Sequence, residues 1–246
     1  MEVVGDTRFD RVLQIKEQAK QLPLVEQFIR GEGKPLVFVA GSSWPPDEEI
    51  FLRYFREHPE WTLIIAPHVI GEDHLQQIEK LLDGFHVERY TRLKAPLSSP
   101  EGDTNASSAS TNAIEAPSGA VGGAPGAVGG ARALIIDCFG LLSSIYRYGQ
   151  VAYVGGGFGV GIHNVVEAAV WGMPVFFGPN NQRFREAQEL KQNGGGIEIN
   201  SYDDFARCMD ELAANPEMLA ERGRTAGDYV NSRAGATEKI FKYLQL

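Results

Sequence analysis

The stretch that decides the fold is Y-V-G-G-G-F-G-V-G-I-H-N-V-V-E-A-A-V-W-G-M-P-V-F-F-G-P, which runs from Tyr153 to Pro179. A short apolar segment at 151–154 leads into five glycines within seven residues. A helical pattern of apolar residues follows the glycines, and Gly172 ends it before a second apolar segment at 174–177. This order of strand, glycine loop, helix and strand predicts a βαβ unit, and with it a parallel sheet.

The glycine loop is typical of an anion-binding turn. A loop that feeds a helix offers free backbone N–H groups and the positive end of the helix dipole to a negative ligand. Glycine suits this place because a side chain would hold a phosphate away from the backbone. The helix is expected to begin near Ile162, and the candidate phosphate contacts lie in the loop before it: Gly157, Phe158, Gly159 and Gly161.

Three polar residues follow the loop at helical spacing. His163, Asn164 and Glu167 are predicted to share one helix face because Glu167 lies four and three residues after the other two. The rise from His163 to Glu167 would be about 6 Å, which is roughly the separation of a phosphate from its own ribose hydroxyls. We therefore expect Glu167 to bind a ribose diol. The alternative is that the glycines serve close packing and that Glu167 belongs to a solvated helix face.

A nicotinamide dinucleotide is disfavoured as the ligand of this loop. The fingerprint G-x-G-x-x-G requires a third glycine at the position where Val160 stands. The strand expected at 174–177 also lacks the acidic residue that binds a ribose after such a strand. The loop therefore predicts another kind of nucleotide ligand.

The composition limits the possible functions. The chain has 246 residues and a net charge of −9, which argues against a nucleic-acid partner. An apolar content of 43% supports an ordinary globular core. Cys138 and Cys208 are far apart and have no C-x-x-C spacing, which favours a reduced compartment. The sequence contains no run of 18 apolar residues and no signal-peptide pattern, so the chain as given is expected to be soluble.

The rest of the chain alternates between apolar strands and amphipathic helices. Further strands are expected at 35–40, 62–66, 86–90, 133–137 and 197–199. Helices are expected at 8–30 with a break at Pro23, 47–57, 72–82, 141–148, 184–192, 202–212, 216–232 and 236–244. This alternation predicts one α/β domain with a doubly wound, Rossmann-like parallel sheet of about six strands.

Two of these strands end in polar residues. Ser42 and Ser43 follow the strand at 35–40, where they either contact an anion or simply cap the next helix. His68 comes directly after Pro67, which follows the strand at 62–66. Open α/β sheets bind their ligands at this carboxyl edge, so His68 is a candidate ligand contact.

The segment from Ser98 to Gly130 differs in kind from the rest. It has no aromatic residue and no Lys or Arg, and the sequence V-G-G-A at 121–124 recurs at 128–131. Such a segment cannot bury enough apolar surface to offset its ordering entropy, so we predict a disordered insertion between two strands. The short apolar start at 2–4 further suggests that an N-terminal half precedes this domain in the whole protein.

The motifs together resemble a known family. The residues G-G-G-F-G-V-G-I-H-N-V-V-E-A-A-V-W-G-M-P-V-F-F-G-P-N at 155–180 are similar to the C-terminal domain of 3-deoxy-D-manno-octulosonic acid (Kdo) transferases. Those enzymes are glycosyltransferases of the GT-B fold. Further similar residues are V-G-D-T-R-F-D-R-V at 4–12, A-G-S-S-W at 40–44, the segment 137–146, Asn180, and Phe184 with Glu186 and Ala187.

The resemblance implies a donor, an acceptor and a place in the cell. The donor is CMP-Kdo, and the sugar is transferred with inversion to a lipid A precursor in lipopolysaccharide synthesis, without a metal or other cofactor. The nucleotide binds the C-terminal domain, whereas the catalytic base, a Glu, lies in the N-terminal half. That half, absent here, would also make the membrane contact, at the cytoplasmic face of the bacterial inner membrane.

The resemblance also assigns roles to residues of this chain. The backbone at 157–161 would hold the CMP phosphate, and Ser42 and Ser43 would contact the phosphate or the sugar acid. Pro67 and His68 would lie near the cytosine, and Glu167 would take the ribose. Many members carry an Arg-His pair where Pro67 and His68 stand, a Glu at Leu141 or Leu142, and a Pro where Val165 stands.

Two other functions stay open on the sequence. The first is the donor domain of a GT-B glycosyltransferase or epimerase that uses a UDP-sugar, because a glycine loop followed by E-A-A-x-x-G-x-P is compatible with such domains. The second is a nucleotide-binding regulatory module without catalysis. Binding of CMP, UDP and NAD would distinguish these functions.

Overall fold

The computed structural model describes residues 4–30, 36–94 and 131–244. The predictions made for the segment 98–130 and for the apolar start at 2–3 lie outside these residues. The described part contains seven strands, which all pair in parallel in the order β3-β4-β2-β1-β5-β6-β7. The strands are β1 Leu36–Ser43, β2 Trp61–Pro67, β3 His86–Arg89, β4 Arg132–Ile135, β5 Val151–Val154, β6 Val175–Phe177 and β7 Gly196–Glu198.

The parallel α/β sheet is confirmed, with seven strands rather than about six. Each of the seven strands lies at a segment that the sequence analysis expected to be a strand, so only the total of about six was too low. The helices are α1 Thr7–Glu17, α2 Pro23–Ile29, α3 Pro45–Phe55, α4 Glu72–Leu81, α5 Tyr90–Lys94, α6 Leu142–Ile145, η1 Tyr146–Tyr148, α7 Val166–Ala169, α8 Arg185–Asn193, α9 Tyr202–Ala214, α10 Pro216–Ser232 and α11 Ala236–Leu244.

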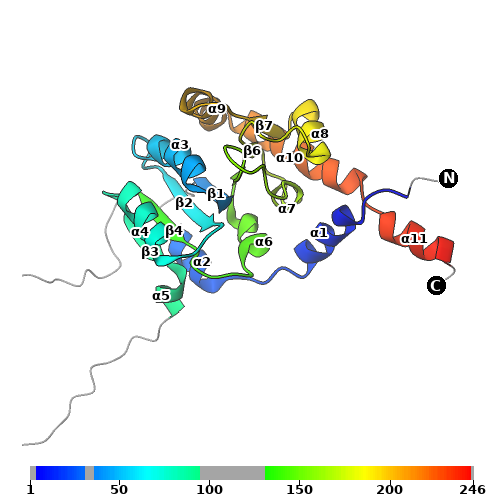
Figure 1. Ribbon diagram of the computed structural model, residues 1–246, viewed down its shortest axis with the longest axis horizontal. Helices are drawn as coiled ribbons and strands as arrows, with labels where there is room; N and C mark the ends of the chain where they lie inside the picture. The colour runs from blue at the N-terminus through cyan, green and yellow to red at the C-terminus, as the bar shows by residue number, and fades with distance from the viewer. Residues whose placement is uncertain (1–3, 31–35, 95–130, 245–246) are drawn as a thin grey trace, which may run out of the picture.

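Helices cover both faces of the sheet, as the doubly wound architecture requires (Figure 1). Alternate residues of β1 point to opposite faces, so Val37 and Val39 enter one core whereas Phe38 and Ala40 enter the other. The first core is completed by residues of α1, α2, α7, α8 and α10, and the second by residues of α3, α4 and α9. Burial on both faces explains why β1 and β2 read as continuous apolar runs.

Pro23 has a different role from the one expected of it. The sequence predicted one helix over 8–30 that breaks at Pro23. The structure instead ends α1 at Glu17 and begins α2 with Pro23 itself. Proline is well suited to the first position of a helix, because its missing N–H would have no partner there.

The prediction of a helix that begins near Ile162 is wrong. Residues 155–165 form an irregular loop, and α7 begins only at Val166 and has four residues. The φ angle of Gly161 is +116°, which is incompatible with a helix at that point. The side chain of Asn164 then accepts the N–H of Val166 at 3.3 Å, so the helix starts after it. His163 and Asn164 therefore share no helix face with Glu167.

The topology brings two strand-end loops together. The chain runs outward from β1 through β2 in one direction, and from β5 through β6 and β7 in the other, so the switch point lies between β1 and β5. Ligands of open parallel sheets bind outside the carboxyl ends of the strands at such a point. Among the helices that the structure describes, none is both long enough and apolar enough to cross a membrane.

Candidate functional site at the switch point

The loops that follow β1 and β5 touch through their backbones. The N–H of Gly155 donates to the carbonyl of Gly41 at 3.0 Å, which extends the pairing of the two strands. A Cβ atom at Gly155 would lie 2.3 Å from the carbonyl oxygen of Ser42, so only glycine permits this approach. The next residue, Gly156, has a φ angle of +94° and begins the turn of the glycine loop.

Ser42 has a strained backbone at this contact. Among the described residues it is the one non-glycine residue with a positive φ angle, +53°. The pairing of β1 with β2 is irregular here, between Gly41 and Ser43. A left-handed conformation costs an ordinary residue about 1–2 kcal/mol, and such strain is found preferentially at ligand sites. The half-buried Ser42 thus lies where the sequence placed it, at the edge of the candidate site.

The glycine loop is held from its outer side by Asn180, which follows β6. The backbone N–H of Asn180 donates to the carbonyl of Gly157 at 2.9 Å, and its side chain donates to the carbonyl of Gly159 at 2.7 Å. Gly161 closes the loop by donating to the carbonyl of Gly156 at 3.0 Å. The carbonyl groups of Gly156, Gly157 and Gly159 therefore have protein partners.

Some backbone N–H groups of the loop donate to protein acceptors and others do not. Within the described residues, the backbone N–H groups of Gly157, Phe158 and Val160 have no hydrogen-bond acceptor in the protein. The ring of Phe158 lies against Gly178, so Phe158 can offer its backbone but not its side chain. Backbone N–H groups that converge in a turn form a concave site for an anion. The loop therefore keeps three N–H donors that a ligand could accept from, without a long helix behind it.

A buried carboxylate that the sequence analysis missed supports the loop from beneath. Asp47, on α3, is 1% exposed. It accepts hydrogen bonds from the hydroxyl of Tyr153 at 2.8 Å, the N–H of Gly156 at 2.9 Å and the N–H of Trp44 at 3.0 Å. Burial raises the pKa of Asp47, against the opposing effect of these hydrogen bonds. Asp47 therefore fixes the glycine loop to the first turn of α3.

Three aromatic rings form a cluster beside the loop. The ring of His68 stacks on Trp44, with centroids 4.6 Å apart, and on His163, with centroids 4.5 Å apart. The Nε1–H of Trp44 donates to Nε2 of His163 at 3.2 Å, so the neutral His163 carries its proton on Nδ1. Burial lowers the pKa of His163 and the neighbouring His68 lowers it further, while Asp47 opposes both. His163 is thus held neutral as an acceptor.

The arrangement of the cluster leaves one ring face open. Trp44 and His163 are hydrogen-bonded to each other, so both lie on the same side of His68. In the part of the chain that the structure describes, no other ring stacks on His68, which is an exposed residue. Its outer face can therefore receive a planar ligand. Pro67 is the buried last residue of β2 and pairs with Ser43, so it fixes the backbone directly before His68.

Ser43 supports the site rather than lining it. The residue is 0% exposed, and its hydroxyl donates to Oε1 of Glu48 at 2.7 Å. In this conformation its hydroxyl has no surface to offer to a ligand. The contact that the sequence suggested for Ser43 would require the loop after β1 to move.

Glu167 lies at the start of α7 with part of its hydrogen-bonding capacity used. The side-chain amide of Asn164 donates to Oε1 at 3.1 Å, and the hydroxyl of Ser143 lies 3.4 Å from Oε2. The two oxygens of a carboxylate together accept about four hydrogen bonds, so Glu167 can still take two hydroxyls of a ligand. Ser143 was not predicted, because it belongs to α6 and meets Glu167 only in the folded chain.

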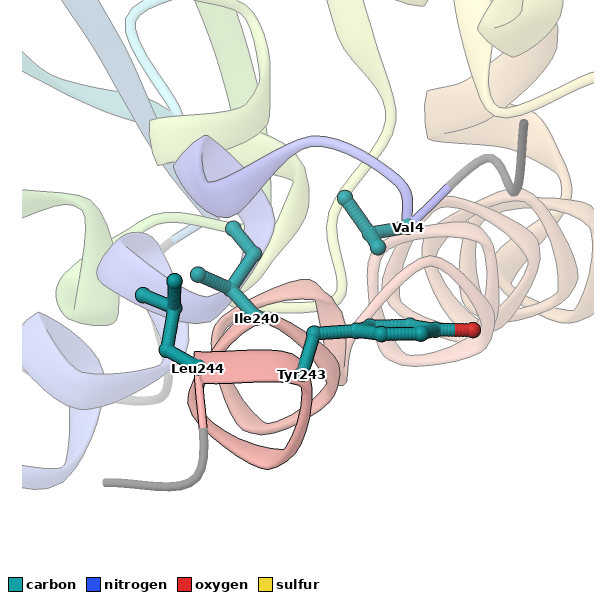
Figure 2. Close-up of a pocket in the computed structure, with 4 residues that line it drawn as sticks. All are labelled: Val4, Ile240, Tyr243 and Leu244. Carbon is teal, nitrogen blue, oxygen red and sulfur yellow. The ribbon is translucent and has the colours of Figure 1, made fainter.

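A separate pocket lies away from the strand ends. It is lined by Val4, Ile240, Tyr243 and Leu244, between the start of the described chain and α11 (Figure 2). Three of these four side chains are aliphatic, and Tyr243 contributes the one hydroxyl. Such a lining lacks the polar groups that orient a nucleotide, so we assign the candidate site to the switch point.

The fold and the site define a class of protein. A parallel sheet wound on both faces, with a glycine loop at its switch point, is the architecture of doubly wound nucleotide-binding domains, and the domains of GT-B glycosyltransferases share it. No protein-family model matches the chain. The chain is 35% identical over 81 residues to the 3-deoxy-D-manno-octulosonic acid transferase of Aquifex aeolicus, which is 32% of this chain and 23% of that protein. The resemblance seen in the sequence is therefore confirmed, although the match spans less than a quarter of that relative.

Solved structures agree on the fold. The C-terminal CMP-Kdo binding domain of WaaA from Acinetobacter baumannii superposes with a TM-score of 0.60 and 15% identity, over 92% of this chain and 98% of that one. UDP-GlcNAc 2-epimerase from Neisseria meningitidis, bound to UDP-GlcNAc, gives a TM-score of 0.59 and 13% identity, over 99% of this chain and 54% of that one. At these identities the superpositions establish the fold alone.

Proposed function

We propose that this chain is the nucleotide-sugar donor-binding domain of an inverting glycosyltransferase that uses CMP-Kdo. The observation that carries the proposal is the glycine loop at the switch point: Asn180 binds the carbonyls of Gly157 and Gly159, whereas the N–H groups of Gly157, Phe158 and Val160 have no acceptor among the described residues. The similarity to Kdo transferases supports CMP-Kdo in particular. The whole of 1–246 would then form one domain, with 98–130 as an insertion.

The site offers one group for each part of the nucleotide. The phosphate would accept hydrogen bonds from the free N–H groups of the loop, because a net charge of −9 makes local donors necessary. The cytosine would stack on the open face of His68. The ribose hydroxyls would donate to Glu167, and the strained backbone at Ser42 would face the phosphate or the sugar acid.

The acceptor and the general base would come from elsewhere in the whole protein. Inverting transfer needs a base placed against the acceptor hydroxyl. The matched segment is 23% of the Aquifex aeolicus relative, so the lipid A precursor and the base are assigned to the remainder, as is the contact with the inner membrane. The purified 246-residue chain is therefore expected to bind CMP and to transfer no Kdo to a lipid A precursor. Detectable transfer would contradict this assignment.

Titration calorimetry with CMP, UDP and NAD tests the proposal. CMP is expected to bind more tightly than UDP, because the similar C-terminal domain of WaaA is a CMP-Kdo binding domain. NAD should not bind, because Val160 replaces the third glycine of its fingerprint. Absence of any CMP binding would overturn the proposal.

A UDP-sugar is the second candidate ligand. A glycine loop followed by E-A-A-x-x-G-x-P is compatible with such a donor, and UDP-GlcNAc 2-epimerase shares the fold. Pro67 also departs from the Arg-His pair that many Kdo transferases carry. Tighter binding of UDP than of CMP in the same titration would favour this candidate.

A further inference from the structure

A buried histidine–glutamate pair lies beneath the strand ends of the site. Nε2 of His74, on α4, lies 2.8 Å from Oε2 of Glu48, on α3. The side chain of Glu48 is 1% exposed and that of His74 is 11% exposed. The other ring nitrogen of His74, Nδ1, lies 2.8 Å from the carbonyl oxygen of Val69. No ligand contact is assigned to either residue, so the proposed function leaves the pair unexplained.

The pair belongs to a closed circuit of hydrogen bonds. The hydroxyl of Ser43 donates to Glu48 at 2.7 Å, and the carbonyl of Ser43 accepts the N–H of His68 at 2.9 Å. Because His68 directly precedes Val69, the path from Ser43 through Glu48, His74 and Val69 returns to Ser43. The circuit joins the carboxyl ends of β1 and β2 to the first turns of α3 and α4.

Hydrogen-bond chemistry fixes the protons of the circuit. A carbonyl can only accept, so Nδ1 of His74 carries a proton toward Val69. The contact between Nε2 and Glu48 requires a second proton, held by one partner or the other, and the pair is neutral as a whole in both cases. A neutral pair in which every buried polar atom is bonded is a rigid element, because breaking it would leave a buried group without a partner.

We propose that His74 and Glu48 are positioning residues that hold the His68 segment in its ligand-binding conformation. The inference rests on the proposed function, in which His68 carries the nucleobase. The circuit binds the backbone on both sides of the His68 ring, at its own N–H and at the carbonyl of Val69. Without His74 the second attachment is lost, so the ligand must order the segment as it binds.

Two substitutions separate this role from a general loss of stability. Glu48→Gln keeps the circuit, because the Gln carbonyl accepts the Ser43 hydroxyl and the Gln amide donates to Nε2 of His74. His74→Ala breaks the circuit. His58→Ala is the matched control. His58 also contacts a glutamate, Glu60 at 3.2 Å, but it precedes β2 and so lies at the amino ends of the strands, away from the site.

Calorimetric titration with CMP gives the first measurement. His74→Ala is expected to weaken CMP binding about tenfold, whereas Glu48→Gln and His58→Ala should stay within about twofold of the parent. In a His68→Ala background, His74→Ala should cause no further loss, because the two residues act on the same contact. If His74→Ala does not fold, His74→Gln replaces it, since glutamine can keep the bond to Glu48 and cannot also reach Val69.

Amide hydrogen exchange gives a second measurement that needs no ligand. The His68 N–H should exchange at least about tenfold faster in His74→Ala than in the parent, and at the parental rate in Glu48→Gln. Unchanged exchange at His68 would overturn the positioning role, as would equal CMP affinity in the parent and His74→Ala. A parent that does not bind CMP would overturn the proposed function instead, and exchange alone would then decide the role of His74.

Discussion

At the scale of single residues, two neighbouring carboxylates in the first turn of α3 support opposite sides of the site. Asp47 accepts the N–H of Gly156 at 2.9 Å, and Glu48 accepts the hydroxyl of Ser43 at 2.7 Å. Both are 1% exposed, and burial raises the pKa of each. These acids therefore serve as fixed acceptors for the protein, whereas Glu167, which is only partly buried, is the carboxylate that we propose for the ligand.

Glu167→Ala is expected to weaken CMP binding while the fold stays intact. Hydrogen bonds from the ribose hydroxyls to a carboxylate contribute roughly 1.5–3 kcal/mol, which corresponds to about a 10- to 150-fold loss of affinity. Titration calorimetry should show a smaller loss for 2′,3′-dideoxy-CMP, which lacks these hydroxyls. Glu217→Ala is the matched control, because Glu217 is an exposed acid in the first turn of α10. Equal CMP affinity in the folded parent and Glu167→Ala would remove Glu167 from the site.

The candidate residues that the sequence could place at the sheet edge are those with a local signal. His68 follows a buried strand directly, and the glycines of the loop stand in sequence order, so both could be assigned to the sheet edge. His74 and Ser143 carry no such signal, because their partners Glu48 and Glu167 lie 26 and 24 residues away. Contacts of this kind depend on how helices pack on the sheet, which a single sequence does not specify.

At the scale of elements, the glycine loop depends on close backbone approach at some glycines and not at others. A Cβ atom at Gly155 would lie 2.3 Å from the carbonyl oxygen of Ser42. Because that oxygen belongs to the backbone, no side-chain rotation can relieve the clash. A Cβ atom at Gly159 would have its nearest neighbour at 3.9 Å. The pair therefore offers the same substitution in two environments within one loop.

Gly155→Ala is expected to destabilise the protein by at least about 1–3 kcal/mol, because the added methyl group forces β1 and β5 apart. Gly159→Ala should stay within about 1 kcal/mol of the parent, since its φ angle is not positive and the space is open. Urea unfolding of the parent and the two variants measures both changes. A lower urea concentration at the unfolding midpoint, with an unchanged dependence of the unfolding free energy on urea, reports a loss of stability. Equal stabilities of the two variants would contradict the close approach of the strand-end loops.

The elements differ in how well the sequence predicted them. The buried strands were found because parallel strands are apolar along their whole length. The helix after the glycine loop was misjudged because its apolar spacing continues backward through 162–165, whereas the backbone turns at Gly161. Spacing reports which residues are buried, and in this loop Ile162, Val165 and Val166 are buried without being one helix.

At the scale of the whole molecule, the segments at the two ends of the described chain lie side by side (Figure 1). Asp10, on α1, accepts the backbone N–H groups of Gly235 and Thr237 and so anchors the start of α11. Burial raises the pKa of Asp10, but these backbone hydrogen bonds outweigh it, and the pKa lies below its usual value. Asp10 therefore helps to hold the start of α11 against α1.

Asp10→Asn is expected to destabilise the protein by about 1–2 kcal/mol at pH 7, because asparagine has one acceptor oxygen for two donors. A carboxyl whose pKa is lowered by folding stabilises the native state above its unfolded pKa of about 4, and this contribution is lost as the pH falls through the folded value. The stability difference between parent and variant should thus shrink below about pH 4. Urea unfolding between pH 7 and pH 3 measures it, and a constant difference would contradict the assignment.

The two acids of α3 make this helix a mechanical link between the halves of the site. Asp47 binds the glycine loop, which would hold the phosphate. Glu48 is hydrogen-bonded to Ser43 and His74, which bind the segment at His68 that would hold the base. Because Asp47 and Glu48 are neighbours on one helix, a movement of α3 would change both sets of contacts. A change of the glycine loop on phosphate binding would therefore reach the His68 segment, and inorganic phosphate should then alter the affinity for cytidine with no contact between the two fragments.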